Sequence, residues 1–236
     1  MTRETENAGT APAFASEPTS AEGGGTTPGA RERTNLRRTQ VLEATVRVIS
    51  ERGAEGTRLS DVARAANVSI GLIQHYFETR DELLVSSFDF FNDLWIRDWE
   101  RASRTEADPP QKLLTLLRLS AFEFEDWREV QWRIWVEFWS LCNRNSKFRA
   151  SYAKIYDTFR RPFRDVIIEG VTHGDFSPRN SVEDVVDRLT AQIEGLRVHA
   201  LLEPARLSRE RMFALLQSQV EQDLRFSFPL GSGPQP

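Results

Sequence analysis

Apolar residues recur at the spacing of an α-helix along most of this chain. Stripes of apolar positions three or four residues apart cover 36–49, 59–66, 84–99, 113–124, 130–141, 152–171, 182–202 and 208–226. No stretch of the sequence has the period-two alternation and β-branched residues that are typical of strands. The pattern therefore predicts an all-α protein.

Two short helices joined by a tight turn are predicted between Thr57 and Phe77. We expect Thr57 to cap the first helix, which carries apolar residues at i, i+3, i+4 and i+7. Asn67 tolerates the left-handed backbone of a turn, and Ser69 can cap the second helix. The first half of that second helix includes small and polar residues, and aromatic residues follow them.

These features suit a helix-turn-helix, in which the second helix enters the DNA major groove. Gly71 lets the backbone approach the duplex closely. Gln74 can pair with an adenine edge, His75 with a guanine or a phosphate, and Tyr76 with a phosphate. The alternative is a plain corner of two packed helices, with these polar side chains only solvated.

The stretch from Thr57 to Leu84 resembles the DNA-binding head of the TetR family of bacterial regulators, and especially its BetI-type branch. It ends Val-Ser-Ile-Gly-Leu-Ile-Gln-His-Tyr-Phe-Glu-Thr-Arg-Asp-Glu-Leu-Leu. The resemblance implies an all-helical dimeric repressor with an N-terminal three-helix head and a C-terminal domain that binds a small inducer. It also implies DNA contacts from Arg58, Ser69, Ile70, Gly71, Gln74, His75, Tyr76 and Arg80.

Two positions depart from the pattern of that family. Ile70 stands where many members carry Lys, and Gln74 stands where many carry an aromatic residue. The operator sequence therefore cannot be taken over from the family.

Charge is unevenly distributed along the chain. The 236 residues carry a net charge of −4, but residues 35–80 contain seven arginines and five acidic residues. The stretch from Arg31 to Arg38, which overlaps the start of this range, holds four arginines and one acid. Because phosphate affinity depends on where the cations lie, we add Arg37 and Arg38 to the expected DNA contacts. A merely solvated arginine face is the alternative.

Composition and pattern divide the chain into four parts. Residues 1–33 contain few large apolar side chains and are predicted to be a disordered arm. The DNA-binding head follows at 34–80, a helical ligand-binding and dimerisation domain at 81–226, and a disordered tail at 227–236.

The sequence also limits where the protein is expected to act. It has no run of 18 apolar residues and no secretory signal, so we expect no contact with a membrane. The single Cys142 excludes an intrachain disulfide and suits a reducing cytoplasm.

All six tryptophans lie between residues 95 and 139, among several acidic residues. Electron-rich rings near carboxylates bind organic cations, so we expect a small-molecule inducer that is cationic or aromatic. Two alternatives stay open: the same rings would hold an uncharged lipophilic molecule, or they simply form the core. The candidate pocket residues are Trp95, Trp99, Phe122, Trp132, Trp135, Glu137, Trp139 and Tyr156.

The last two helices are the expected homodimer interface. The resemblance continues through Gln192-Ile193-Glu194-Gly195-Leu196 and implies that these helices pair with their copies in a four-helix interface. Two heads held together also suit half-sites about 34 Å apart on DNA. The alternative is that the two helices only close the core of one chain. The expected interface residues are Val185, Leu189, Ile193, Leu196, Phe213, Leu216 and Val220.

One short string resembles an enzyme. His173-Gly174-Asp175, followed by Asn180, is similar to the catalytic loop of aminoglycoside phosphotransferase-type kinases, where Asp175 would be the base and Asn180 a magnesium ligand. The glycine-rich loop, strand lysine and later Asp-x-Asp of those kinases are absent. We therefore favour an interhelical connection.

Neither a metal nor a cofactor is expected, because the three histidines and Cys142 lack metal-ligand spacing. The sequence predicts a non-enzymatic, ligand-responsive regulator that binds a double-stranded DNA operator. A helical interaction protein without DNA binding is a further alternative.

Overall fold

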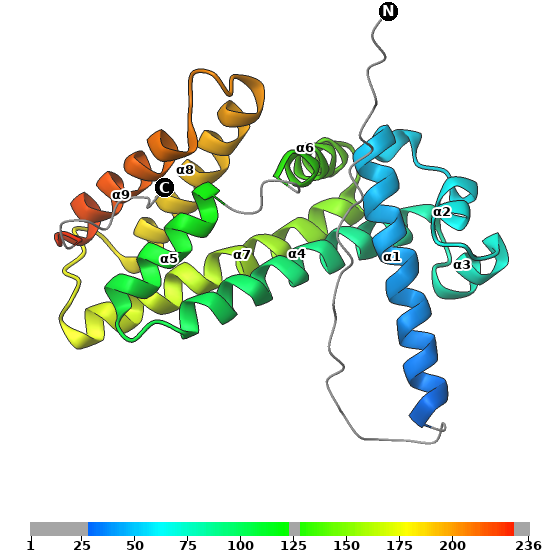
Figure 1. Ribbon diagram of the computed structural model, residues 1–236, viewed down its shortest axis with the longest axis horizontal. Coiled ribbons are helices and arrows are strands. Elements are labelled where there is room, and N and C mark those ends of the chain that lie inside the picture. Colours follow the sequence, from blue (N-terminus) through cyan, green and yellow to red (C-terminus); the bar gives the residue numbers. More distant parts are fainter. Residues whose placement is uncertain (1–27, 123–127, 229–236) are drawn as a thin grey trace, which may run out of the picture.

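The computed structural model describes residues 28–122 and 128–228, and the side chains of 32–121 and 133–228. Over these residues the chain forms nine helices and no strand, which confirms the all-α prediction (Figure 1). The helices are α1 (Pro28–Gly56), α2 (Leu59–Ala65), α3 (Ile70–Tyr76), α4 (Arg80–Arg104), α5 (Pro109–Phe122), α6 (Arg128–Arg144), α7 (Ser146–His173), α8 (Val182–Leu202) and α9 (Arg209–Leu224).

The ends of the described chain differ from the predicted boundaries. Helix α1 begins at Pro28, so residues 28–33 of the predicted disordered arm are helical. Proline is tolerated in the first turn of a helix, and the arginines that follow are good helix formers. Phe228, in the predicted tail, is buried, and its N–H donates to the Glu221 carboxylate. The predicted disorder of 1–27 and 229–236 falls outside the described residues.

Helices α1, α2 and α3 enclose a small core of their own. It is closed by Leu83 at the start of α4 and includes Val41, Val62, Ile73 and Phe77. Asn67 adopts a left-handed backbone with φ 51°, and the Ser69 hydroxyl accepts a hydrogen bond from the Leu72 N–H. The predicted turn and the predicted cap of the second helix are therefore confirmed.

The predicted cap of the first of these helices is wrong. Arg58 occupies the N-cap of α2 without a side-chain cap, and the Thr57 hydroxyl instead donates to the Gly53 carbonyl at 2.8 Å. Thr57 lies in the turn that ends α1, where its hydroxyl satisfies a terminal carbonyl of that helix.

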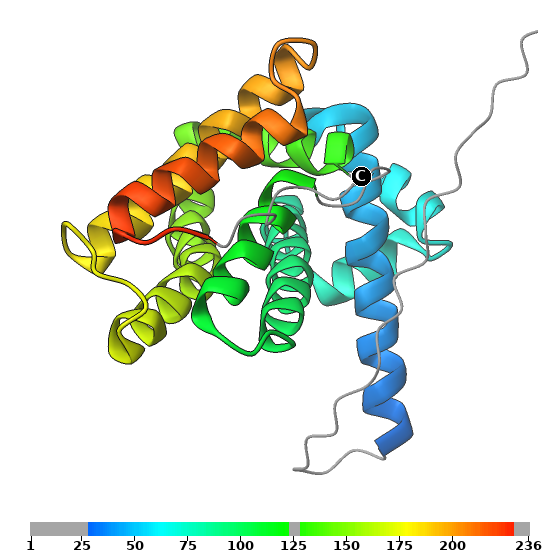
Figure 2. The same cartoon turned by 60° about the vertical axis from the view of Figure 1, so that its left-hand side comes forward.

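The remaining helices form the body. Helix α4 runs from the head into the body and is buried along one side from Leu84 through Phe88, Phe91 and Trp95 to Trp99. Helix α7 packs along α4 and continues through Pro162 without interruption. Helices α8 and α9 lie side by side at the end away from α2 and α3 (Figures 1 and 2).

Candidate DNA-contacting surface and ligand pocket

Helix α3 turns its predicted reading face to solvent. Gln74 and His75 are exposed and Tyr76 is half-buried, whereas Ile73 and Phe77 are buried in the head. The side chains at the start of the helix, Ser69, Ile70 and Gly71, are also exposed. The contact of these residues with DNA stays a prediction.

Three of the predicted phosphate-contacting arginines are exposed on the head. Arg37, Arg38 and Arg58 all face solvent. The Arg38 guanidinium lies 5.1 Å from the centre of the Phe77 ring, which holds it close to the end of α3.

Arg80 has an internal role that the sequence did not indicate. Its guanidinium donates to the backbone carbonyls of Thr57 at 2.8 Å, Glu55 at 3.2 Å and Ala54. These carbonyls belong to the end of α1, where helix carbonyls lack intrahelical donors. Arg80 therefore fixes the end of α1 to the start of α4, and its contact with phosphate stays a prediction.

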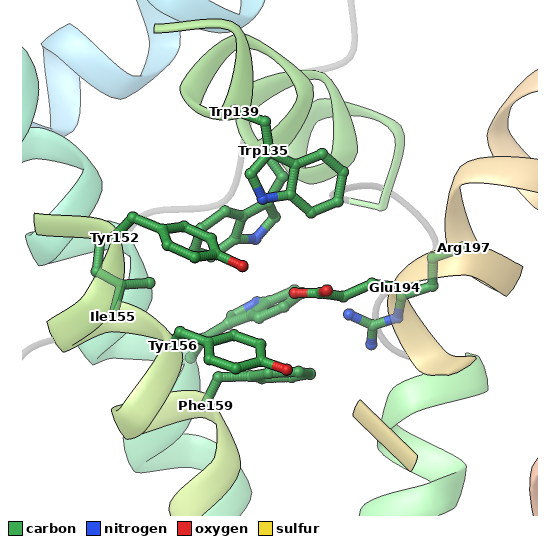
Figure 3. A pocket seen from close by; sticks show the side chains of 9 residues that line it. Trp135, Trp139, Tyr152, Ile155, Tyr156, Phe159, Glu194 and Arg197 are labelled. Carbon is green, nitrogen blue, oxygen red and sulfur yellow. The ribbon is translucent and has the colours of Figure 1, made fainter. Parts of the chain in front are cut away.

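An aromatic pocket of about 340 Å³ opens in the body. Helices α4, α6, α7 and α8 contribute its walls, and Figure 3 shows the Glu194 side chain reaching from α8 toward Tyr152 and Tyr156. The two tyrosine rings stack, with centroids 5.6 Å apart. The lining residues are Trp95, Trp135, Trp139, Tyr152, Ile155, Tyr156, Phe159, Glu194 and Arg197.

Two charged side chains of α8 lie in this largely apolar pocket. Burial raises the pKa of Glu194 to about 7, and the positive charge of Arg197 opposes the shift. Burial, and secondarily the nearby Glu194 carboxylate, raises the pKa of Tyr152 to about 12, so its hydroxyl stays protonated at neutral pH. Arg197 is buried, and its Nε donates to the Ser120 carbonyl at 2.8 Å.

The structure brings together about half of the predicted pocket. Trp95, Trp135, Trp139 and Tyr156 line it. Trp99 is not a lining residue: it is fully buried and stacks on Trp95, with ring centroids 5.6 Å apart. Phe122 and Trp132 fall outside the residues whose side chains are described.

Glu137 was wrongly assigned to the pocket. Its Oε2 accepts a hydrogen bond at 2.8 Å from the backbone N–H of Ala54 in α1. In the sequence Glu137 lies between Trp135 and Trp139. A shift of two residues along a helix, however, turns a side chain to roughly the opposite face, so Glu137 points away from the two tryptophans.

Sequence reasoning missed Tyr152, Ile155, Phe159, Glu194 and Arg197 as lining residues. Glu194 and Arg197 are distant in sequence from the tryptophan cluster. The sequence offered one signal for Glu194: an acidic residue that stands between the apolar residues Ile193 and Leu196 in an amphipathic helix.

Most of the predicted dimer-interface residues do not reach the surface of the chain, whereas the assignment of Leu196 stays a prediction. Six of the seven are already buried within one chain, and Leu196 is half-buried. A helix at an interface has two apolar sides, and the more strongly apolar one faces the core of its own chain. The six buried residues are Val185, Leu189, Ile193, Phe213, Leu216 and Val220.

The enzyme-like string forms the end of a helix. Gly174 caps α7 in a left-handed conformation with φ 88°, and the Asp175 N–H donates to the Gly170 carbonyl. Phe176 packs beneath, against Gly170. The described residues contain no strand, whereas the phosphotransferase alternative requires strands around this loop.

Two kinds of feature are absent from the part of the chain that the structure describes. Within 28–122 and 128–228, no cluster of three or more His, Cys, Asp or Glu side chains is arranged to hold a metal ion. In the same ranges, no helix is both long and apolar enough to cross a membrane.

Comparison with known proteins identifies the family. Residues 41–86 match the model of bacterial regulatory proteins of the tetR family, and residues 110–225 match the C-terminal domain of BetI-type transcriptional repressors. The chain is 32% identical over 196 residues to the HTH-type transcriptional regulator PksA of Bacillus subtilis, covering 78% of this chain and 88% of that protein. This chain belongs to the TetR family. It is a transcriptional regulator, as are the relatives that it matches by name.

Solved structures of TetR-type regulators share the fold. A transcriptional regulator from Saccharomonospora viridis, solved with choline, has a TM-score of 0.70 and 24% identity, covering 80% of this chain and 98% of that one. The regulator FadR from Bacillus subtilis, solved with stearoyl-CoA, has a TM-score of 0.61 and 20% identity, covering 79% and 97%. Similar TetR scaffolds thus hold ligands of very different size.

Proposed function

We propose that this TetR-family protein binds a palindromic operator as a homodimer in the cytoplasm and leaves it when a small quaternary ammonium compound occupies the pocket. The observation that carries the ligand assignment is the set of aromatic rings facing the Glu194 carboxylate. Rings attract an onium group through their negative faces, and the carboxylate adds a negative charge in a partly desolvated site when it is ionised.

The size of the pocket supports the same ligand class. The space among the lining side chains, about 340 Å³ including its opening to solvent, is small and is bounded by residues of four helices. A compound of the size of choline, the ligand of the Saccharomonospora viridis protein, suits this volume better than the acyl chain of stearoyl-CoA, the ligand of Bacillus subtilis FadR.

The arrangement of the head supports operator binding. Buried Ile73 and Phe77 anchor α3, which leaves Gln74 and His75 directed to solvent. A helix held from one side with polar side chains on the other can enter a major groove.

The outer side of α8 supports dimerisation. Ala191, Gly195 and Leu202 are exposed there at i, i+4 and i+11, on one stripe of the helix, and Leu202 is 71% exposed. A second copy packed on α8 and α9 would cover this stripe and hold two heads at a fixed distance. We therefore propose the outer stripe in place of the buried residues first assigned.

The operator assignment is tested with fluorescence anisotropy on DNA that flanks the gene of this protein. We expect binding that weakens steeply with salt, because phosphate contacts release counterions. Changing His75 and Tyr76 to Ala should abolish it, whereas His173→Ala, an exposed histidine in the body, should leave it unchanged. Retained affinity in the double variant would overturn the assignment of the reading helix.

The ligand assignment is tested by thermal shift with choline, spermidine and a flat neutral aromatic compound. Choline should raise the melting temperature and release the DNA. A panel in which only neutral compounds stabilise the protein would refute the quaternary ammonium class.

A further inference from the structure

Helix α6 contacts both the pocket and the head. Trp135 and Trp139 line the pocket, while Glu137 contacts α1. At roughly 100° per residue, Glu137 lies on the side opposite to the line between the two tryptophans. Figure 1 shows α6 lying between α1 and α8, both of which it contacts. Any displacement of α6 by a bound ligand therefore moves Glu137 as well.

Glu137 meets α1 at the one point within this helix where the backbone leaves helical geometry. Gly53 has φ 73° and ψ 163°, and its neighbour Ala54 donates its N–H to Glu137. A Cβ at Gly53 would lie 3.2 and 3.3 Å from the two carboxylate oxygens, so the carboxylate rests directly on the glycine. Ala54 itself is fully buried, and a buried N–H without an acceptor is costly.

The turn after this break leads into the helix-turn-helix. Residues 54–56 form the end of α1, Thr57 follows it, and α2 starts at Leu59. Arg80 holds the carbonyls of this turn from the α4 side, while Glu137 holds its first N–H from the α6 side. We call the turn 54–57 with these two side chains the seam. Its geometry sets how α2 and α3 are oriented relative to the body.

We propose that the hydrogen bond between Glu137 and Ala54 couples the pocket to the DNA-reading head, so that a ligand which displaces α6 breaks this bond and reorients the head. This inference rests on the proposed function. Glu137 is half-buried, so its carboxylate can exchange the Ala54 amide for water once α6 moves. The seam then has two discrete states that a ligand can bias, as coupling between distant sites requires.

The test compares Glu137→Ala with the wild-type chain, using choline as the probe and operator DNA as the reporter. Allosteric coupling is typically about 5- to 150-fold, and in Glu137→Ala the choline-induced loss of operator affinity should fall below about 2-fold. Choline affinity in the absence of DNA should stay within about 3-fold, because Glu137 does not line the pocket. Glu137→Gln retains a carbonyl acceptor and should restore most of the coupling.

Arg144→Ala is the matched control. Arg144 also links α6 to α1, through Glu55, but both of these side chains are largely exposed and such a pair contributes little. The choline-induced loss of operator affinity in Arg144→Ala should therefore equal that of the wild type. The proposal is overturned if Glu137→Ala keeps the full choline response, or if Arg144→Ala loses as much.

A covalent probe separates failure of this inference from failure of the ligand assignment. In a Cys142→Ser background, Tyr156→Cys places a single thiol in the pocket wall. A methanethiosulfonate reagent with a trimethylammonium group labels this thiol and fills the cavity. The pocket is then occupied whether or not choline binds. Labelling should release the operator from this variant but not from the same variant with Glu137→Ala. Equal release from both would contradict the coupling role.

Hydrogen exchange supplies a measurement on the chain with native Glu137. In the labelled Tyr156→Cys protein, the peptide that contains Ala54 should exchange faster than in the unlabelled protein, because its amide has lost its acceptor. Unchanged exchange at this peptide would also overturn the proposal, even if the Glu137→Ala variant failed to fold.

Discussion

The guanidinium of Arg197 lies 5.1 Å from the centre of the Trp95 ring and 5.5 Å from that of Trp99. The protein therefore places a cation of its own on the α4 side of the pocket, where it is held by the Ser120 carbonyl. The cationic ligand that we propose would be repelled from this side and would meet the wall formed by α6 and α7. We expect the charge of the Glu194 carboxylate to decide how well the pocket tolerates this second positive charge.

Tyr152 offers a test of the aromatic wall. Tyr152→Leu should weaken choline binding about 5- to 30-fold, because a partly desolvated cation–π contact contributes about 1 to 2 kcal/mol. Tyr152→Phe retains the ring and should bind within about 3-fold of the wild type. Isothermal titration calorimetry measures both affinities. Equal losses in the two variants would show that the ring face is not what binds the ligand.

Choline binding should strengthen as the pH rises from 6 to 8. The pKa of Glu194 is raised to about 7 by burial, so protonation below that pH removes the negative charge that the cation needs. Calorimetry in buffers of different ionisation enthalpy should detect proton release on binding. Glu194→Gln should bind weakly and without this pH dependence, since the amide carries no negative charge for the ligand cation at any pH. A flat profile for the wild type would exclude Glu194 as the counter-ion.

The Glu194 carboxyl group should also make the free energy of unfolding depend on pH, but this free energy should fall where choline binding strengthens. Its folded pKa lies above the unfolded value of about 4.5, so the folded state binds more protons between these values. The resulting contribution to the free energy of unfolding is fully present below pH 4.5 and is lost as the pH rises through 7. Relative to Glu194→Gln, the wild type should therefore lose melting temperature between pH 6 and pH 8 in the absence of ligand. A constant difference between the two proteins would contradict the raised pKa.

Gly170→Ala should destabilise the body. A Cβ at this position would lie 2.2 Å from Cδ2 and 2.3 Å from Cε2 of Phe176, so the ring or the helix has to move. Overpacking of this kind lowers the free energy of unfolding by about 1 to 3 kcal/mol. Urea denaturation of the variant and the wild type measures this difference. Gly71→Ala, whose Cβ would meet only the Ser69 hydroxyl at 3.9 Å, serves as the control and should be nearly neutral. Similar stabilities for the two variants would mean that Phe176 is not packed as described.

Gly195→Leu tests the outer stripe of α8. Among the described residues, and apart from the nearby backbone of α8 itself, no heavy atom lies within 4 Å of a Cβ built at Gly195, so this position has open space around it within one chain. If a second copy packs closely there, Leu should raise the dimer dissociation constant more than about 10-fold, since each 1.4 kcal/mol is tenfold. Analytical ultracentrifugation measures this, with Gly195→Ala as the smaller change. An unaltered dimer in Gly195→Leu would place the interface elsewhere.

Local features of the head could be predicted from the sequence because they depend on neighbouring residues. Ser69 caps α3 as expected, through a hydrogen bond from the N–H group of Leu72, and Thr79 caps α4 in the same way through the N–H group of Glu82. The prediction failed at Thr57, because this residue belongs to the turn at the end of α1: its hydroxyl donates to the Gly53 carbonyl four residues earlier, and Arg58 takes the N-cap of α2.

The pocket could be predicted only in part. Helical spacing identifies an apolar face but not the element that covers it, so Trp95 and Trp135 were found while Glu137 was assigned to the wrong face. The same ambiguity led to Val185 and Ile193 being taken for interface residues, although the core of the chain buries them. Glu194 and Arg197 approach the tryptophans only through the packing of α8, which no local pattern encodes.

The described walls of the pocket come from α4, α6, α7 and α8, and none comes from α1, α2 or α3. Substitutions that retune the cavity for a different inducer can therefore accumulate without altering the side chains directed at the operator. A gene copy could in this way acquire a new chemical signal while continuing to control the same promoter.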